Sequence, residues 1–122
     1  MSIDEARRPL YEVKANLFKG LAHPFRIRLL ELLSASPELS VAQLQVETGL
    51  EPSHLSQHLA VLRRHRLVLS RRQGSYVYYR LANPAIAQML AVARTLLLDL
   101  LRTDSAHLAQ SEALPALRAA AS

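Results

Sequence analysis

The stretch from Leu50 to Leu69, LEPSHLSQHLAVLRRHRLVL, constrains the fold more than any other part of the chain. Leu55, Leu59 and Leu62 recur at helical spacing, which predicts one helix whose apolar stripe packs on a core. The opposite side carries small or hydrogen-bonding residues rather than the Glu/Lys mixture of an ordinary solvated face. Such a helix suits the major groove of DNA, where serine and glutamine reach base edges. By itself it is equally consistent with a surface helix that has a basic end.

Charge is distributed unevenly along the 122 residues, whose formal net charge is +5. No Asp or Glu occurs between Pro52 and Leu98, whereas seven arginines lie in that span and all ten acidic residues lie outside it. A basic middle with near-neutral ends is typical of a surface that binds a polyanion. A membrane surface is a weaker alternative, because no basic amphipathic helix with a Trp- or Phe-rich face is present.

Composition narrows the class of protein. The chain is long enough for one domain with a real core and is 50% hydrophobic, so we expect it to fold. The absence of cysteine excludes disulfides and thiolate metal sites. The segment MSIDEARRPL has no apolar core of a signal peptide, and no apolar run is long enough to span a bilayer. We therefore expect a cytoplasmic protein without a membrane partner.

Apolar periodicity and capping residues predict four helices in the first half of the chain. Ser40 and Gln43 form a capping-box pattern at the start of a short helix, and Gly49 suits the left-handed residue at its end. Two short helices joined by a tight turn containing glycine are a helix-turn-helix. The expected helices cover about residues 10–20, 24–34, 41–48 and 52–66.

The pattern changes after Arg66. Residues 67–71 and 76–81 predict two strands, joined by the turn Arg72–Ser75, and a helix-turn-helix followed by such a basic hairpin is a winged helix. Asn83-Pro84 then starts a last helix that runs to about Thr103 and is apolar on more than one face. In so short a chain, a second copy is the expected partner of that helix, giving a two-fold dimer. The alternative is that the first helix covers it within one chain.

We therefore predict a mainly α fold with a small β-hairpin (α+β). It is a winged helix-turn-helix in the order helix, helix, helix, helix, strand, strand, helix, dimerising through its first and last helices. Residues 1–104 are expected to form the DNA-binding and dimerisation domain, and residues 105–122 a partly flexible C-terminal tail. The residues expected at the dimer interface are Leu10, Val13, Leu17, Met89, Val92, Leu96, Leu97 and Leu100.

Three motifs occur in order: LFKGLAHPFRIRLLELL, ELSVAQLQVETGLEPSHLSQHLAVLRRHRLV and RRQGSYVYYRL. Together, over about Leu17 to Leu81, they resemble the ArsR/SmtB family of small bacterial repressors. The resemblance implies a homodimeric winged helix that binds an inverted repeat in promoter DNA and is usually released by an inducer.

The expected DNA contacts form three groups. The residues that the resemblance implies for base reading are Ser53, Ser56 and Gln57, with His54 and Val41 beside them. The residues that it implies at the wing are Arg71, Arg72 and Gln73. Charge alone adds phosphate contacts at Arg63 and Arg64.

Two metal sites used in this family are absent from the sequence. Ser40 and Ala42 stand where a cysteine box at the start of the third helix would need thiolates. The last helix has no histidine before His107, so the family's Asp and His pairs are missing there as well. No cofactor is therefore evident.

Weaker metal candidates remain. Asp104, His107 and Glu112 could hold a weakly bound nickel or zinc ion, on spacing alone. His54 and His58 have the i,i+4 spacing of helical ligands, but a metal there would interfere with DNA reading, so a structural role for His58 is preferred.

The sequence thus predicts a DNA-binding transcriptional regulator, specifically a repressor that recognises a pseudo-palindromic operator as a homodimer. It does not predict an enzyme, since it has no cysteine nucleophile, Gly-rich phosphate loop or HExxH motif. Two alternatives stay open: a dimeric adaptor that acts with a separate sensor or co-regulator protein, and an atypical nickel or zinc sensor.

Overall fold

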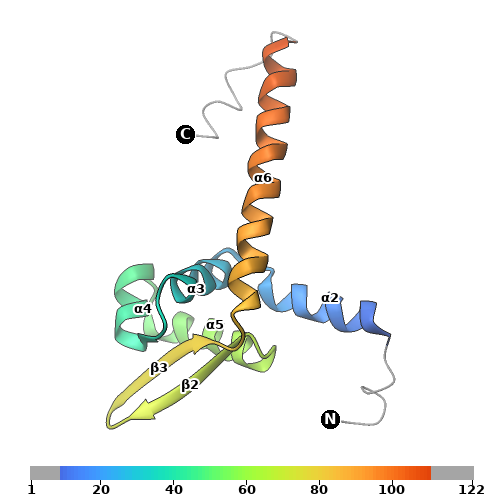
Figure 1. Ribbon diagram of the computed structural model, residues 1–122. Coiled ribbons are helices and arrows are strands. Elements are labelled where there is room, and N and C mark those ends of the chain that lie inside the picture. Colours follow the sequence, from blue (N-terminus) through green and yellow to red (C-terminus); the bar gives the residue numbers. More distant parts are fainter. Residues whose placement is uncertain (1–8, 111–122) are drawn as a thin grey trace. The chain divides into compact units, whose positions relative to one another are not determined.

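The computed structural model describes residues 9–110 as five helices and three strands (Figure 1). The chain divides into two compact units, the first ending at Ala87 and the second beginning at Gln88.

The first unit contains the predicted helix-turn-helix and hairpin. Its helices are α2 (Leu10–Leu21), α3 (Pro24–Ala35), α4 (Val41–Thr48) and α5 (Pro52–Arg64). Its strands are β1 (Leu39–Ser40), β2 (Val68–Gln73) and β3 (Tyr76–Leu81). The four helices and the hairpin confirm the sequence prediction to within a residue or two at most ends. The hairpin lies beside α4 and α5, β3 contacting the former and β2 the latter (Figure 1).

The sheet has one strand more than the sequence predicted. Its order is β1-β3-β2, with both pairs antiparallel, so β3 is the central strand. β1 consists of two residues, Leu39 and Ser40, opposite Tyr79 and Tyr78. A strand this short has no alternation to detect, which is why the expected two-stranded hairpin was incomplete.

The core of the first unit is built mainly from leucine. Leu55, Leu59 and Leu62 of α5 are 0%, 2% and 0% exposed, so the predicted apolar stripe is confirmed. They join further fully buried residues from α3, α4 and the start of the hairpin: Leu29, Leu30, Leu44, Leu67 and Val68. The stripe fixes which side of α5 faces solvent.

Local signals set the helix-turn-helix. The Ser40 Oγ accepts a hydrogen bond from the Gln43 backbone N–H at 3.1 Å, and the Gln43 Oε1 accepts one from the Ser40 N–H at 2.8 Å. This is the predicted capping box of α4. Gly49, with φ 68°, ends α4 in the left-handed region, which glycine adopts without a steric cost. α5 begins at Pro52, directly after this turn.

The last helix, α6 (Ala85–Gln110), begins in the first unit and continues through the second. It continues beyond the expected end near Thr103 as far as Gln110, because no proline or glycine interrupts the sequence there. The division proposed at residue 104 therefore falls within a helix, and residues 111–122 of the proposed tail lie outside the described residues. In the described range, no helix combines the length and the apolar character needed to cross a bilayer.

Candidate nucleic-acid interface

The solvent side of α5 carries the four residues expected to meet bases. Ser53, His54, Ser56 and Gln57 are all exposed, while Leu55 between them is completely buried. Their hydroxyl and amide groups therefore project from a helix that the core holds on its other side. This arrangement presents hydrogen-bond donors and acceptors on a rigid helix.

A groove with a volume of about 910 Å³ runs between α5, the start of α4 and the hairpin. Its lining brings together four of the predicted DNA-binding residues: Val41 from α4 and Ser56, Arg63 and Arg64 from α5. Arg63 and Arg64 occupy the last turn of α5 and are exposed. The groove thus combines small polar groups with two cations, as contact with a phosphodiester backbone requires.

The three predicted wing residues lie in a strand and not all on one face. Arg72 is opposite Val77, whereas Arg71 is opposite Tyr78 and Gln73 is opposite Tyr76. The expected turn Arg72–Ser75 was too long, because pairing continues to Gln73 and leaves a two-residue turn in which Gly74 has φ 62°.

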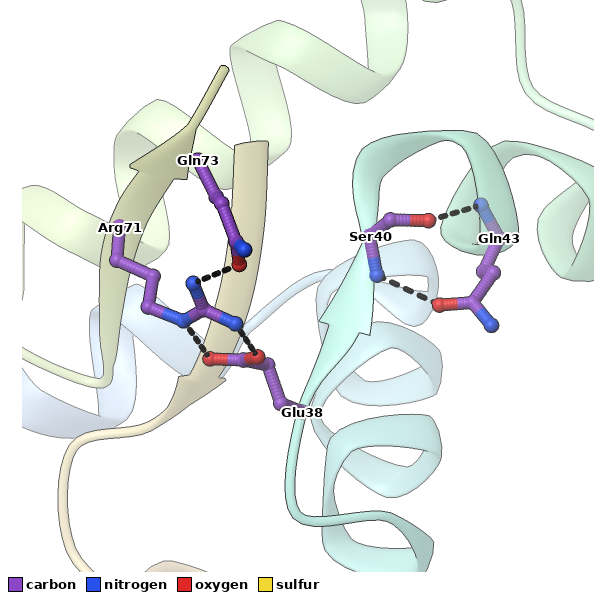
Figure 2. Close-up of polar contacts among 5 residues, drawn as sticks. All are labelled: Glu38, Ser40, Gln43, Arg71 and Gln73. Atoms are coloured by element: carbon purple, nitrogen blue, oxygen red, sulfur yellow. Dashed lines mark hydrogen bonds and ion pairs between the residues drawn. The ribbon is translucent and has the colours of Figure 1, made fainter. Parts of the chain in front are cut away.

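Arg71 is engaged within the protein (Figure 2). Its Nε donates to the Glu38 Oε2 at 2.7 Å and its Nη2 donates to the Glu38 Oε1 at 2.5 Å. Its Nη1 donates to the Gln73 Oε1 at 2.8 Å, and its guanidinium lies 4.5 Å from the centre of the Tyr78 ring. The hydrogen bonds from Arg71 hold the pKa of the Glu38 carboxyl below its ordinary value and raise the pKa of Arg71.

Glu38 is not among the residues that the sequence predicts for this interface. It lies 33 residues before Arg71, and the two meet because β1 and β2 both pair with β3. The sole sequence signal is that Glu38 is an acidic residue just before the capping box of α4.

His58 of α5 has a structural environment. Its ring lies 4.4 Å from that of His23 and 6.0 Å from that of Phe25. The His23 Nδ1 in turn accepts a hydrogen bond from the Phe25 backbone N–H at 3.1 Å, which caps α3. Partial burial lowers the pKa of His58, and its basic neighbours His23, Arg26 and His54 lower it further. These contacts support the structural role expected for His58.

The described residues contain no cluster of side chains that could form a metal centre. Within residues 9–110, no three His, Asp or Glu side chains are arranged to hold an ion. Asp104 and His107 both lie on α6, and Glu112 lies outside the described residues, so the weak site on these three residues stays a prediction.

Comparison with known proteins decides the family. Residues 23–70 match the family described as bacterial regulatory protein, arsR family. Rv0081 of Mycobacterium tuberculosis, an uncharacterized HTH-type transcriptional regulator, is 52% identical over 89 residues, covering 73% of this chain and 78% of that protein. This chain belongs to the arsR family. The crystal structure of Rv0081 superposes on it with a TM-score of 0.74 and 49% identity, over 80% of this chain and 98% of that one.

Two further relatives bear on what an arsR-family chain does. The biofilm growth-associated repressor of Xylella fastidiosa strain 9a5c is 38% identical over 82 residues, covering 67% of this chain and 71% of that protein. Mb0332 of Mycobacterium bovis has a homodimeric winged helix-turn-helix DNA-binding domain that is 30% identical with a TM-score of 0.67, over 80% of this chain and 87% of that one. The family and its fold confirm a DNA-binding transcriptional regulator rather than an enzyme.

Proposed function

We propose that this regulator is a homodimeric repressor that binds a pseudo-palindromic operator, with α5 of each subunit in a major groove. One observation carries the proposal: α5 exposes Ser53, Ser56 and Gln57 on the side opposite its buried leucines, beside the groove that holds Arg63 and Arg64. Repression is proposed by similarity to the Xylella fastidiosa repressor. Action on promoter DNA also places the protein in the bacterial cytoplasm.

Base reading is assigned to α5. Gln57 carries both a carbonyl and an amide group, which can bond in pairs to the N6 and N7 of adenine in the major groove. Ser53 and Ser56 are small enough to let the helix approach the base edges closely. Each specific base contact of this kind contributes on the order of 1–3 kcal/mol of discrimination.

Phosphate binding is assigned to the arginines around the groove. Arg63 and Arg64 would meet the backbone at the end of α5, and the hairpin would meet it on the other side of the groove. These contacts fix the position of α5 on the duplex and are the same for every sequence.

Dimerisation is assigned to α2 and α6, each of which has an apolar surface of its own. Leu10 and Val13 of α2 are 67% and 48% exposed, and Val92, Leu96 and Leu97 of α6 are 68%, 57% and 57% exposed. Contiguous apolar surface of this kind marks an interface. The Mycobacterium bovis relative is homodimeric, which supports a two-fold dimer here. A two-fold dimer would present two copies of α5 to half-sites about one helical turn apart.

The decisive experiment selects binding sites from random duplex DNA and then titrates the selected duplex in gel shifts. We expect an inverted repeat that binds two protomers. Gln57→Ala should lose preference at one base position in each half-site, while the control Gln88→Ala, an exposed glutamine on α6, should keep it. A selected site without two-fold symmetry, or full preference retained by Gln57→Ala, would contradict the proposal.

A further inference from the structure

Glu38 and Arg71 connect all three strands of the sheet. Glu38 directly precedes β1, Arg71 lies on β2, and the ring of Tyr78 on the central strand β3 lies beneath the guanidinium at 4.5 Å. The two charged groups are joined by two parallel hydrogen bonds of 2.7 and 2.5 Å, as Figure 2 shows. A paired contact of this geometry fixes orientation as well as distance.

The same contact fixes the outer part of the hairpin relative to the helix-turn-helix. Arg71 also donates to Gln73, the last residue of β2, so the tip of the strand is held through it. At the other end, Glu38 is separated by only Leu39 from Ser40, which caps α4. The series of contacts from Gln73 through Arg71 to Glu38, which lies two residues before Ser40, therefore links the wing tip to the start of α4 (Figure 2).

Arg72 lies on the opposite face of β2. Directly opposed residues in an antiparallel pair share a face, and alternate residues of a strand share one too. Arg72 therefore lies on the face of its partner Val77 and of Val68, which is 1% exposed. Val77 lines the groove with Arg63 and Arg64 of α5. Within the described residues, the Arg72 guanidinium makes no hydrogen bond or ion pair.

We infer that Glu38 is a positioning residue for DNA binding: it clamps Arg71 and thereby sets the wing, so that Arg72 and not Arg71 is the wing arginine that contacts phosphate. The inference rests on the proposed function for its DNA partner, although the clamp itself belongs to the free protein. It divides the two adjacent arginines, which the sequence presents as equivalent, into a structural residue and a contact residue.

The first test needs no DNA. Hydrogen–deuterium exchange of the full-length protein should become several-fold faster at the amides of the outer part of β2 and β3 in Glu38→Gln and in Arg71→Ala. Arg72→Ala should leave these amides unchanged. Unchanged exchange in both Glu38→Gln and Arg71→Ala would overturn the clamp, whatever the protein binds.

The second test exploits the opposite charges of the clamp. If the clamp positions the wing, Glu38→Gln and Arg71→Ala should weaken binding to the selected operator by the same factor, and the double variant should lose no more than either single one. If charge alone mattered, removing the carboxylate would strengthen binding to DNA and removing the guanidinium would weaken it. Opposite effects of the two substitutions on affinity would therefore overturn the inference.

The salt dependence of affinity identifies the phosphate contact. Each phosphate contact contributes about 0.9 to the slope of log K against log salt, or about 1.8 for both wings of a dimer. Arg72→Ala should flatten the slope by that amount, and adding Arg71→Ala to that variant should flatten it no further. Further flattening in the double variant, or none by Arg72→Ala, would overturn the assignment. Failure of the wild-type protein to bind any duplex would instead count against the proposed function, and hydrogen exchange would still decide the clamp.

Discussion

Gly20 is a buried position of α2 that lies against His65, directly after α5. A Cβ added there would lie 2.7 Å from both the Cβ and the Cγ of His65, the C-cap residue of α5, and 3.1 Å from its Cδ2. Carbon atoms in ordinary contact are about 3.5–4.0 Å apart, so an alanine would force the two elements apart by roughly 1 Å. We therefore expect Gly20→Ala to destabilise the protein.

Two opposing effects set the size of this change. Overpacking costs about 1–3 kcal/mol, while replacing a glycine by alanine inside a helix stabilises it by about 1 kcal/mol. The free energy of unfolding should therefore fall by about 1 kcal/mol, which lowers the Tm of a chain of 122 residues by roughly 4 °C.

Thermal unfolding followed by circular dichroism, at one fixed protein concentration, measures the effect. His65→Ala removes the crowded Cγ and Cδ2 but keeps the Cβ, so it should rescue Gly20→Ala only in part, whereas His65→Gly removes all three atoms and should recover most of the loss in a double-mutant cycle. A rise in Tm for Gly20→Ala would refute the reasoning, because it would mean that the glycine is not needed for the approach of α2 to α5.

Three further predictions address pH, capping and assembly. Burial lowers the pKa of His58 in the folded protein below 6.5. On acidification His58 therefore takes up a proton in the unfolded chain before it does so in the folded one, and the free energy of unfolding should decline as the pH falls below about 6.5. Urea titrations at pH 5.5 and 7.5 measure the free energy of unfolding at each pH. The difference between the two values should be smaller in His58→Gln than in the wild-type protein, and an equal difference would exclude His58 as the cause. Ser40→Ala removes the capping hydroxyl of α4 and should lower the free energy of unfolding by about 1 kcal/mol, measured by urea titration at pH 7.5. The control Ser53→Ala, at an exposed serine, should change it little. Leu97→Asp introduces a charge on the exposed apolar surface of α6. It should convert the dimer to a monomer in light scattering and weaken operator binding. A persistent dimer would contradict the assignment of α6 to the interface.

The parts of the fold that sequence predicts here are those with local signals. The stripe of Leu55, Leu59 and Leu62 repeats at the helical period, so it identifies both α5 and its buried side. The capping box of α4 spans four residues, and Gly49 marks the end of that helix. These signals do not depend on the rest of the chain, so they also placed Ser53, Ser56 and Gln57 on the solvent side of α5.

Contacts between distant segments left no such signal. The pairing of Glu38 with Arg71 depends on β1, which is too short to show alternation, and on a sheet in which β3 lies between the two outer strands. Likewise, His23 packs against His58 only because α3 and α5 meet in the core. Spacing along the chain suggested a metal pair at His54 and His58, whereas the folded contacts of His58 are with another imidazole and Phe25.

In the wing, a shift of one residue in β2 would exchange the faces on which Arg71 and Arg72 lie. Leu67, Val68 and Leu69 are consecutive apolar residues, so alternation in the sequence does not tell which parity of β2 faces inward. In the fold Val68 is 1% exposed and Leu69 is 42% exposed, which places even-numbered residues of the strand on the inner face. Arg72 follows Val68 by four positions and shares its face, while Arg71 follows Leu69 and meets Glu38 on the outer side. The parity of this strand therefore determines which of two adjacent arginines is available to the groove.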